Sequence, residues 1–303
     1  MQQTVMSGLD GRNPMAFFAS LGALLATSRV RPDASPRLSW TNEPIPRPTL
    51  HANLDAEDLI DALDGDRGLW SASVALEFDG LDDVKLPAGA QREYLRACRS
   101  ADDGGRSPLL GAALIAEGAF AGTGDGKPTD LHFNAGQQRF LMIARSLRDQ
   151  VTAEDLREAV FGPWTYSRTA PTFGWDVSDD RIYALSAADP SKDTKHTMPG
   201  ADWLGLVGLG AFPVVRSDGK STPPGASGTW KRGEFRWGLW DQPLDWSSAA
   251  ALIAMGLSDT AKEARVGLFR VMRSAIRRSD QGGYGSFSPS TIEWGRTRDQ
   301  HQH

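Results

Sequence analysis

The chain has 303 residues, a length that suits one large domain or two smaller ones. Hydrophobic residues make up 40% and charged residues 23%, which excludes both a wholly disordered chain and a coiled coil. The net charge of −5 argues against a protein that coats nucleic acid indiscriminately, but it hides an asymmetry. Residues 1–130 carry a net charge of −7 and residues 131–303 a net charge of +2, so the local field differs between them.

The cysteine content and the apolar runs bear on the cellular compartment. Cys98 is the only cysteine, which excludes an intrachain disulfide and a cysteine-based zinc site and fits a reducing cytoplasm. The apolar run Pro14–Ala26 is shorter than the roughly 20 residues of a membrane span. A signal peptide would need a basic residue before this run, and Met1–Met6 contains none. We therefore expect a cytoplasmic protein that does not contact a membrane.

The first half of the chain is dominated by helical patterns. Asn13 and Pro14 before an apolar stretch predict a helix start, with Asn13 as the N-cap. The apolar spacing after Pro14 is typical of a core helix, and Gly22 within it indicates a close packing contact. Ser107 is the expected N-cap of a later helix. The further elements expected in this half are helices over 55–63, 91–98 and 108–120, and strands over 38–40 and 74–78.

The segment Gly122–Pro128 is glycine-rich and polar, and it lies where the charge balance changes. It predicts a boundary between an acidic, helix-rich lobe over 1–122 and a mixed lobe over 129–303, with a single domain as the alternative. The segment does not match a phosphate-binding loop. Only three residues separate Gly122 from Gly126, and Pro128 stands where Ser or Thr is needed.

The second half mixes short strands with helices. Thr152 and Asp155 resemble a capping box for a helix that ends near Gly162. The other elements expected here are helices over 137–150, 201–207 and 247–255, strands over 181–185, 211–215 and 234–239, and a turn over 280–285. The apolar spacing of residues 266–276 fits neither the period of a helix nor that of a strand. The whole pattern predicts an α+β fold, helix-rich in its first half, with short antiparallel strands concentrated in the second.

No catalytic constellation stands out. None of the five histidines forms a His-x-x-x-His pair, and no Gly-x-Ser-x-Gly elbow occurs. We expect His132 to be hydrogen-bonded and half-buried, and Cys98 to be an unreactive thiol. The sequence thus predicts no metal, no cofactor and no catalytic residue. The ten tryptophans leave a carbohydrate-active hydrolase with a Trp-lined cleft as an alternative.

Basic residues give the strongest functional signal. Five arginines and no acid lie between Arg265 and Arg278. On a helix, Arg270, Arg273 and Arg277 would share one face, whereas on strands they would line an edge or a face. We expect these three side chains to project into solvent on one surface and to contact phosphates. The candidate nucleic-acid-binding residues are Lys192, Lys195, His196, Lys231, Arg232, Arg265, Arg270, Arg273, Arg277 and Arg278.

Several short blocks within residues 8–245 carry a family resemblance. The blocks are Leu9-Asp-Gly-Arg-Asn-Pro-Met-Ala-Phe-Phe-Ala-Ser-Leu-Gly-Ala-Leu, Thr129-Asp-Leu-His-Phe-Asn-Ala-Gly-Gln-Gln-Arg-Phe-Leu, Phe161-Gly-Pro-Trp, Thr172-Phe-Gly-Trp-Asp, Asp189-Pro-Ser-Lys-Asp, Pro199-Gly-Ala-Asp-Trp-Leu, Phe212-Pro-Val and Phe235-Arg-Trp-Gly-Leu-Trp. Together they resemble proteins encoded in type I-G (formerly I-U) CRISPR loci, either the large-subunit-like component of the effector complex or an accessory protein.

The resemblance implies a non-catalytic subunit of an RNA-guided, DNA-targeting complex in a bacterial cytoplasm. Its partners would be CRISPR RNA, target DNA or both, together with the neighbouring subunits. In such complexes guide pairing reads the sequence, while the proteins contact the backbone and a short flanking motif. The remaining alternative is an interaction protein of another defence system. It would be favoured if acidic residues of the same chain neutralised the arginines between Arg265 and Arg278.

Overall fold

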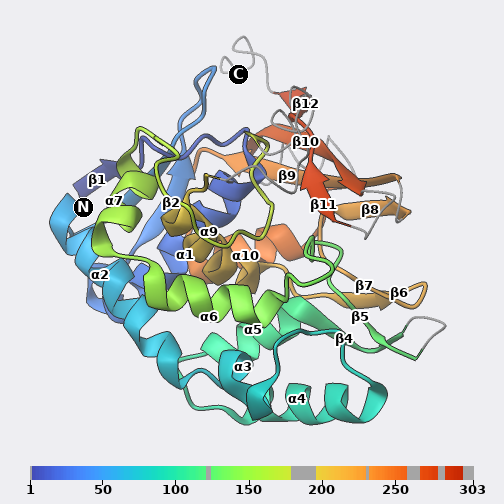
Figure 1. Ribbon diagram of the computed structural model, residues 1–303. Coiled ribbons are helices and arrows are strands. Elements are labelled where there is room, and N and C mark those ends of the chain that lie inside the picture. Colours follow the sequence, from blue (N-terminus) through green and yellow to red (C-terminus); the bar gives the residue numbers. More distant parts are fainter. Residues whose placement is uncertain are drawn as a thin grey trace.

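The computed structural model describes residues 2–120, 124–178, 196–229, 232–257, 267–278 and 284–295. Helices dominate the first half and antiparallel strands the second (Figure 1), which confirms the α+β class. The elements in chain order are β1 (Gln2–Val5), α1 (Pro14–Val30), β2 (Arg37–Trp40), β3 (Pro48–Ala52), α2 (Ala56–Leu69), α3 (Val74–Glu77), α4 (Ala88–Ser100), α5 (Arg106–Leu114), β4 (Ile115–Phe120), β5 (Gly126–Pro128), α6 (Phe140–Gln150), α7 (Ala153–Phe161), α9 (Pro199–Gly208), β6 (Val215–Ser217), β7 (Lys220–Thr222), β8 (Ala226–Thr229), β9 (Arg232–Trp240), α10 (Trp246–Ala254), β10 (Leu268–Arg278), β11 (Gly285–Phe287) and β12 (Thr291–Gly295).

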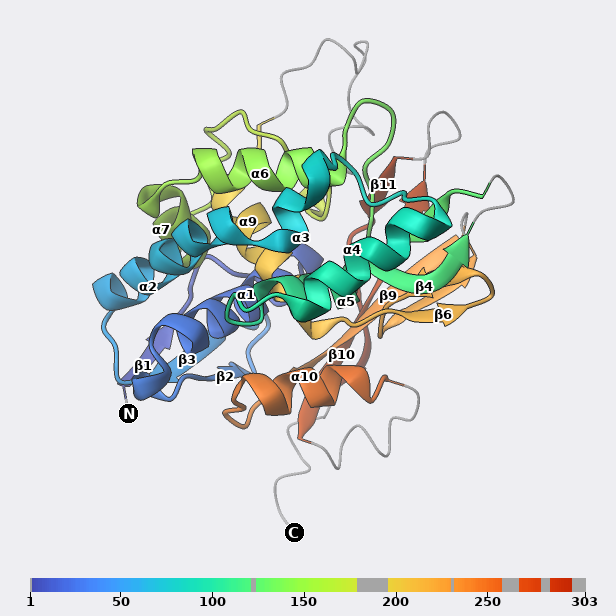
Figure 2. The ribbon, with the colours of Figure 1, turned by 90° about the horizontal axis from the view of Figure 1, so that it is seen from below.

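Helix α1 lies in the interior of the molecule. Asn13 caps it as predicted, because its side-chain oxygen accepts the N–H of Met15 at 3.0 Å and Pro14 occupies the first turn. Every residue from Pro14 to Thr27 is buried, so the helix is covered on all sides. Helix α9 packs against it, and Figure 2 shows α6 and α7 on one side of this pair and α10 on the other.

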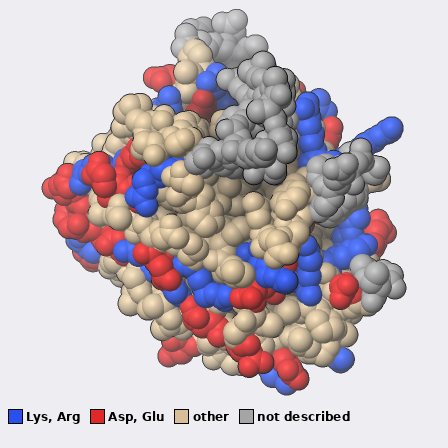
Figure 3. Space-filling view, in the orientation of Figure 1, with Lys and Arg blue, Asp and Glu red and all other residues tan. Residues whose placement is uncertain are grey.

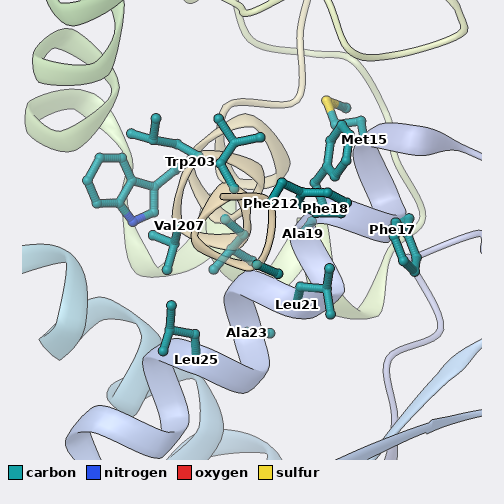
Figure 4. Packing of buried hydrophobic residues seen from close by; sticks show 14 of the residues in the cluster. Met15, Phe17, Phe18, Ala19, Leu21, Ala23, Leu25, Trp203, Val207 and Phe212 are labelled. Atoms are coloured by element: carbon teal, nitrogen blue, oxygen red, sulfur yellow. The ribbon is translucent and has the colours of Figure 1, made fainter. Parts of the chain in front are cut away.

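The close contact predicted at Gly22 is present and faces α9. A Cβ atom on Gly22 would lie 1.8 Å from the carbonyl oxygen of Leu204, and one on Gly208 would lie 1.9 Å from that of Phe18. These glycines therefore let the backbones of α1 and α9 approach each other. The buried side chains around this crossing (Figure 4) include Phe17, Phe18, Leu21, Leu25, Trp203, Val207 and Phe212.

The largest sheet in the described ranges has the strand order β11-β10-β9-β8, and β12 also pairs with β10. Its inner face packs on α1: the ring of Trp237 lies 6.1 Å from that of Phe17, and the ring of Phe235 lies 5.3 Å from that of Phe18. A three-stranded sheet with the order β1-β3-β2 adjoins it. The N–H of the Trp240 indole joins the two sheets by donating to a β2 carbonyl at 2.7 Å.

The parts of the chain before and after the Gly122–Pro128 segment are in extensive contact. One hydrophobic cluster contains buried residues from both parts. Strands β4 and β5 pair across the segment, of which residues 121–123 lie outside the described ranges. The Trp237 indole also donates to the carbonyl oxygen of Gly11 at 2.9 Å. The sheet of the second half therefore rests directly on the N-terminal part.

Two predicted elements of the first half are wrong. Residues 74–77 form the short helix α3 in place of a strand, because the N–H groups of Leu76 and Glu77 donate to the carbonyl oxygen of Ser73 at 3.1 Å. The hydroxyl of Ser107 accepts the N–H of Ala75 at 2.9 Å in the first turn. The segment 108–120 divides into α5 and β4, since its second part pairs with β5. Ser107 is not the N-cap of α5. Its N–H instead donates to the carboxylate of Asp103 at 3.0 Å.

In the second half, the predicted elements over 201–207 and 234–239 are confirmed within α9 and β9, and the helix predicted over 247–255 is confirmed as α10, which ends at Ala254. The strand predicted over 211–215 is wrong, because a 3₁₀ turn and Pro213 precede β6 and proline has no N–H for a ladder. The ambiguous segment 266–276 belongs mainly to β10. The strand predicted over 181–185 and most of the turn over 280–285 lie outside the described residues.

Candidate nucleic-acid interface

Strand β10 directs its arginines to opposite faces of the sheet. Its register with β9 is unbroken from Arg270 to Ile276, so successive side chains alternate between the two faces. Arg273 and Arg277 are exposed on the outer face, whereas Arg270 and Arg278 fall on the inner one. The prediction that Arg270, Arg273 and Arg277 share one surface is therefore wrong. Residues three apart share a face on a helix but lie on opposite faces of a strand.

Arg278 is bound inside the molecule. Its guanidinium donates to the carbonyl oxygens of Asp130 at 2.6 Å and His132 at 3.0 Å, and it lies 5.2 Å from the centre of the Phe133 ring. Burial lowers the pKa of Arg278 to about 10, so the group is still charged at neutral pH. These contacts tie the end of β10 to the loop after β5, which makes Arg278 a structural residue and removes it from the candidate surface.

Arg270 is half-buried at the other end of β10. Its guanidinium donates to the carbonyl oxygen of Glu43 at 3.1 Å. Burial lowers the pKa of Arg270, and the nearby charge of Arg12 adds to the effect. Arg270 thus joins the sheet to the β2–β3 connection and does not point in the same direction as Arg273.

The outer face of the sheet gathers four arginines into what we call the arginine face: Arg232 and Arg236 of β9, and Arg273 and Arg277 of β10. Arg236 lies directly opposite Arg273, and continuation of the same register places Arg232 opposite Arg277. Directly opposed side chains on a sheet begin about 5 Å apart, and like charges at that spacing are destabilising. Anions close to the four guanidinium groups are therefore needed to offset this repulsion.

Two glutamates supply part of that negative charge. Glu293 contacts Arg236 at 2.5 Å, and Glu234 contacts Arg273 at 3.6 Å. The Arg273 and Glu234 side chains are 46% and 42% exposed, so their ion pair contributes little to folding. Among the described residues no carboxylate lies within ion-pair distance of Arg232. Of the described charged side chains on this face, four are arginines and two are glutamates, and Arg277 has a further interaction.

The other predicted binding residues are dispersed. His196 is exposed and precedes Thr197, which bridges to Arg168. The structure brings together Arg232, Arg273 and Arg277 and adds Arg236, which sequence reasoning missed. Strand alternation from Arg232 would have identified it. The predicted binding residues that lie outside the described ranges are Lys192, Lys195, Lys231 and Arg265.

The charge asymmetry of the sequence is visible on the surface. In Figure 3, acidic side chains are frequent at the left edge, over α2 and α7, and the centre of this face carries few charges. Lysine and arginine side chains are more frequent towards the right, where the strands of the second half lie. Contact with a polyanion is therefore favoured at the strand-rich side of the molecule.

The titratable groups singled out in the sequence are buried. In the described ranges no three His, Cys, Asp or Glu side chains meet closely enough to hold a metal ion. Burial raises the pKa of Cys98 to about 11, so the group is a thiol at neutral pH. His132 is hydrogen-bonded as expected, to Asp83 at 3.0 Å, but it is buried and not half-buried. Burial also lowers the pKa of His132.

The blocks that carry the family resemblance are linked inside the molecule. Hydrogen bonds connect Asn13 to Asp176 (2.8 Å), Leu131 to Trp175 (2.8 Å), Phe173 to Asp202 (3.1 Å) and Gly11 to Trp237 (2.9 Å). The blocks are far apart in sequence, yet these bonds join five of them into one network of buried and partly buried groups. The network fixes how α1, α9 and β9 are placed relative to one another.

Comparisons of the sequence with protein-family models and with curated proteins find no match. In the part of the chain that the structure describes, no helix is both long and apolar enough to span a bilayer. The chemistry of the residues and the resemblance of the sequence blocks are therefore the basis for assigning a function.

Proposed function

We propose that this protein is a non-catalytic subunit of a type I-G CRISPR antiviral complex in the cytoplasm. In this role it contacts neighbouring subunits and the backbone of CRISPR RNA, target DNA or both. The resemblance of the sequence blocks supports membership of the complex. The arginine face supports contact with the backbone, because guide pairing reads the sequence and leaves phosphate contacts to the protein.

The pairing of four arginines on one exposed sheet face is the observation that carries the proposal. Arg273 and Arg277 are four residues apart, about 13 Å along a strand, a length that matches about four nucleotides of B-form DNA. Their opposed partners on β9 form a second row about 5 Å away. Guanidinium groups present forked donors that fit phosphate oxygens. The sheet fixes the spacing of these groups before a ligand arrives.

The charge of the whole chain limits where nucleic acid can bind. The net charge of −5 and the acidic surface over α2 and α7 disfavour binding of a polyanion at that side of the molecule. Among the described residues of the arginine face, arginines outnumber glutamates by four to two. Binding at this face is therefore electrostatic, independent of sequence and sensitive to salt.

The test is a triple variant, Arg232→Ala, Arg273→Ala and Arg277→Ala, assayed by fluorescence anisotropy with labelled single-stranded and duplex DNA and RNA. Each lost phosphate contact should lower the slope of log affinity against log salt by about 0.7–0.9, so three losses should lower it by about 2–3. The fold should survive, because exposed arginines contribute little to stability.

A matched control replaces three exposed arginines of α4, Arg92, Arg96 and Arg99, and thereby removes the same charge from another surface. This control should retain the wild-type salt slope. Both variants are also tested with the partner subunits present. Full retention of target binding by the arginine-face variant, alone and with partners, would contradict the proposed contact.

The hydrolase alternative lacks a supporting observation of its own. Six tryptophans are at most 2% exposed and belong to the core: Trp40, Trp70, Trp175, Trp203, Trp237 and Trp240. Of the described residues that line a cleft of about 670 Å³ beside Trp164, Asp10 is the only acid, and it is paired with Arg12 at 2.7 Å. Glycosidases use two carboxyl groups about 5–10 Å apart, an arrangement that this cleft does not offer.

A further inference from the structure

A cleft of about 670 Å³ opens in the N-terminal part of the molecule and shares no residue with the arginine face. Its volume lies within the range of about 300–1,000 Å³ typical of small-molecule sites. The cleft is lined by residues drawn from the segments 7–13 and 161–166, by Arg47 and Val177, and by Pro289 and Ser290. Figure 1 shows the ends of β1 and α7, which lead into segments 7–13 and 161–166, and the β2–β3 connection, which contains Arg47, on one side of the molecule.

A buried carboxylate fixes two sides of the cleft. Asp176 is 5% exposed and accepts hydrogen bonds from the Asn13 amide at 2.8 Å and the Tyr166 hydroxyl at 2.7 Å. Tyr166 has a φ of +52°, a left-handed conformation that is rare for a bulky residue. The hydrogen bond to Asp176 offsets the cost of this conformation. The wall that carries Tyr166 is therefore held in place before any ligand binds.

Trp164 provides a flat apolar surface in this wall. Its indole N–H donates to the carbonyl oxygen of Ala159 at 2.9 Å, so the ring has no further hydrogen bond to donate. Tyr166 supports it edge-on, with the ring centres 6.2 Å apart. A ligand in the cleft can therefore contact Trp164 only through the carbon surface of the ring, which suits the stacking of another planar ring.

Two arginines line the same cleft as this ring. Asp10 binds the Nε and Nη2 atoms of Arg12 at 2.7–3.1 Å, which fixes the guanidinium and leaves Nη1 without a bond to any described residue. Arg47 lines the cleft, and no carboxylate in the described ranges lies within ion-pair distance of it. Its backbone is fixed by reciprocal bonds with Thr41, each 2.9 Å long. The charged side chains that line the cleft are thus two arginines and one aspartate, and Asp176, which is bonded to two lining residues, adds a second carboxylate.

We propose that this cleft binds a nucleotide, with the base stacked on Trp164 and the phosphate at Arg47 and the free edge of Arg12. A stacking surface next to an unpaired guanidinium is the combination that recognises a planar base joined to a phosphate. The ligand is either a free nucleotide or one nucleotide of a single strand. The second source rests on the function proposed above, whereas the first is independent of it.

The probes are AMP, inorganic phosphate, a single-stranded pentanucleotide and an acidic pentapeptide, each titrated calorimetrically into the full chain. Trp164→Ala should weaken AMP binding about 5- to 100-fold, the usual effect of losing one stacked base. Trp164→Phe keeps an aromatic ring and should retain most of the affinity. Arg47→Gln should weaken AMP binding, and Arg92→Gln, a matched change on α4, should have no effect.

The titrations distinguish a free nucleotide from a nucleotide within a strand, and both of these from a phosphate or peptide ligand. Binding of AMP alone identifies a free nucleotide, and binding of both AMP and the pentanucleotide identifies a nucleotide within a strand. Either result supports the site if the Trp164 and Arg47 variants weaken it. The proposal is overturned if AMP does not bind, if phosphate or the acidic peptide binds as tightly as AMP, or if those variants bind like the wild type. The triple arginine-face variant should bind AMP normally, so failure here is distinct from failure of the proposed function.

Discussion

Replacement of Gly22 by alanine tests the packing of the two central helices. A methyl group at this position would lie 1.8 Å from the carbonyl oxygen of Leu204 and 3.1 Å from the backbone nitrogen of Gly208. Carbon and oxygen atoms normally approach to about 3.4 Å, so α1 and α9 would have to separate by about 1.5 Å. Neither backbone atom can move independently of its helix, and the strain therefore spreads through the surrounding core.

The magnitude follows from two opposing effects. Overpacking of a core typically costs about 1–3 kcal/mol, and the backbone contact at Gly22 places this change at or above the upper end. Alanine in place of glycine within a helix contributes about 1 kcal/mol of helix propensity in return. We therefore expect Gly22→Ala to reduce the free energy of unfolding by about 2 kcal/mol or more, as measured by urea denaturation.

Gly65 of α2 provides the control. A Cβ atom there would lie 3.9 Å from Val30, an ordinary contact, so Gly65→Ala should stabilise the protein by about 0.5–1 kcal/mol. If Gly22→Ala were as stable as the wild type, or stabilised to the same extent as Gly65→Ala, the close approach of α1 and α9 would be refuted.

Two further predictions concern buried charges. Asp66 contacts Arg106 at 2.6 Å and Arg29 at 3.8 Å. Asp66→Asn would leave these two buried cations without their anion, so it should lower the free energy of unfolding in urea by about 3–5 kcal/mol. A decrease below about 1 kcal/mol would argue against this cluster. Because burial lowers the pKa of His132, the unfolded chain binds an extra proton as the pH falls below about 6.5, and stability should fall with it. His132→Gln should flatten the profile of unfolding free energy between pH 6.5 and 5, and an unchanged slope would contradict the assignment.

Local rules of helix capping predicted much of the fold from sequence. Asn13 caps α1, and Thr152 with Asp155 forms the expected capping box of α7. Gly22 correctly indicated a close contact. Glycine weakens a helix, so within a helix it is favoured mainly where the missing side chain lets two backbones approach each other. These features depend on neighbours within a few residues or on a single residue type, so the sequence alone is enough to predict them.

The features that were missed depend on residues distant in the chain. The first turn of α3 has an N–H group bonded to the distant Ser107 hydroxyl, and the second part of segment 108–120 becomes a strand only because β5 pairs with it. Apolar spacing could not assign residues 266–276, so the faces on which Arg270 and Arg273 lie could not be predicted. The arginine face needs two strands in register, and a linear pattern of basic residues does not contain that information.

The most direct test of the proposed function is purification of the tagged chain from cells that express its own locus, followed by sequencing of the RNA and identification of the proteins that accompany it. Membership of the complex predicts repeat-derived guide RNA and the other effector subunits in fixed proportion. The arginine-face variant should recover the same subunits with less target DNA bound. Recovery of the wild-type chain alone, without RNA or partner subunits, would contradict the account.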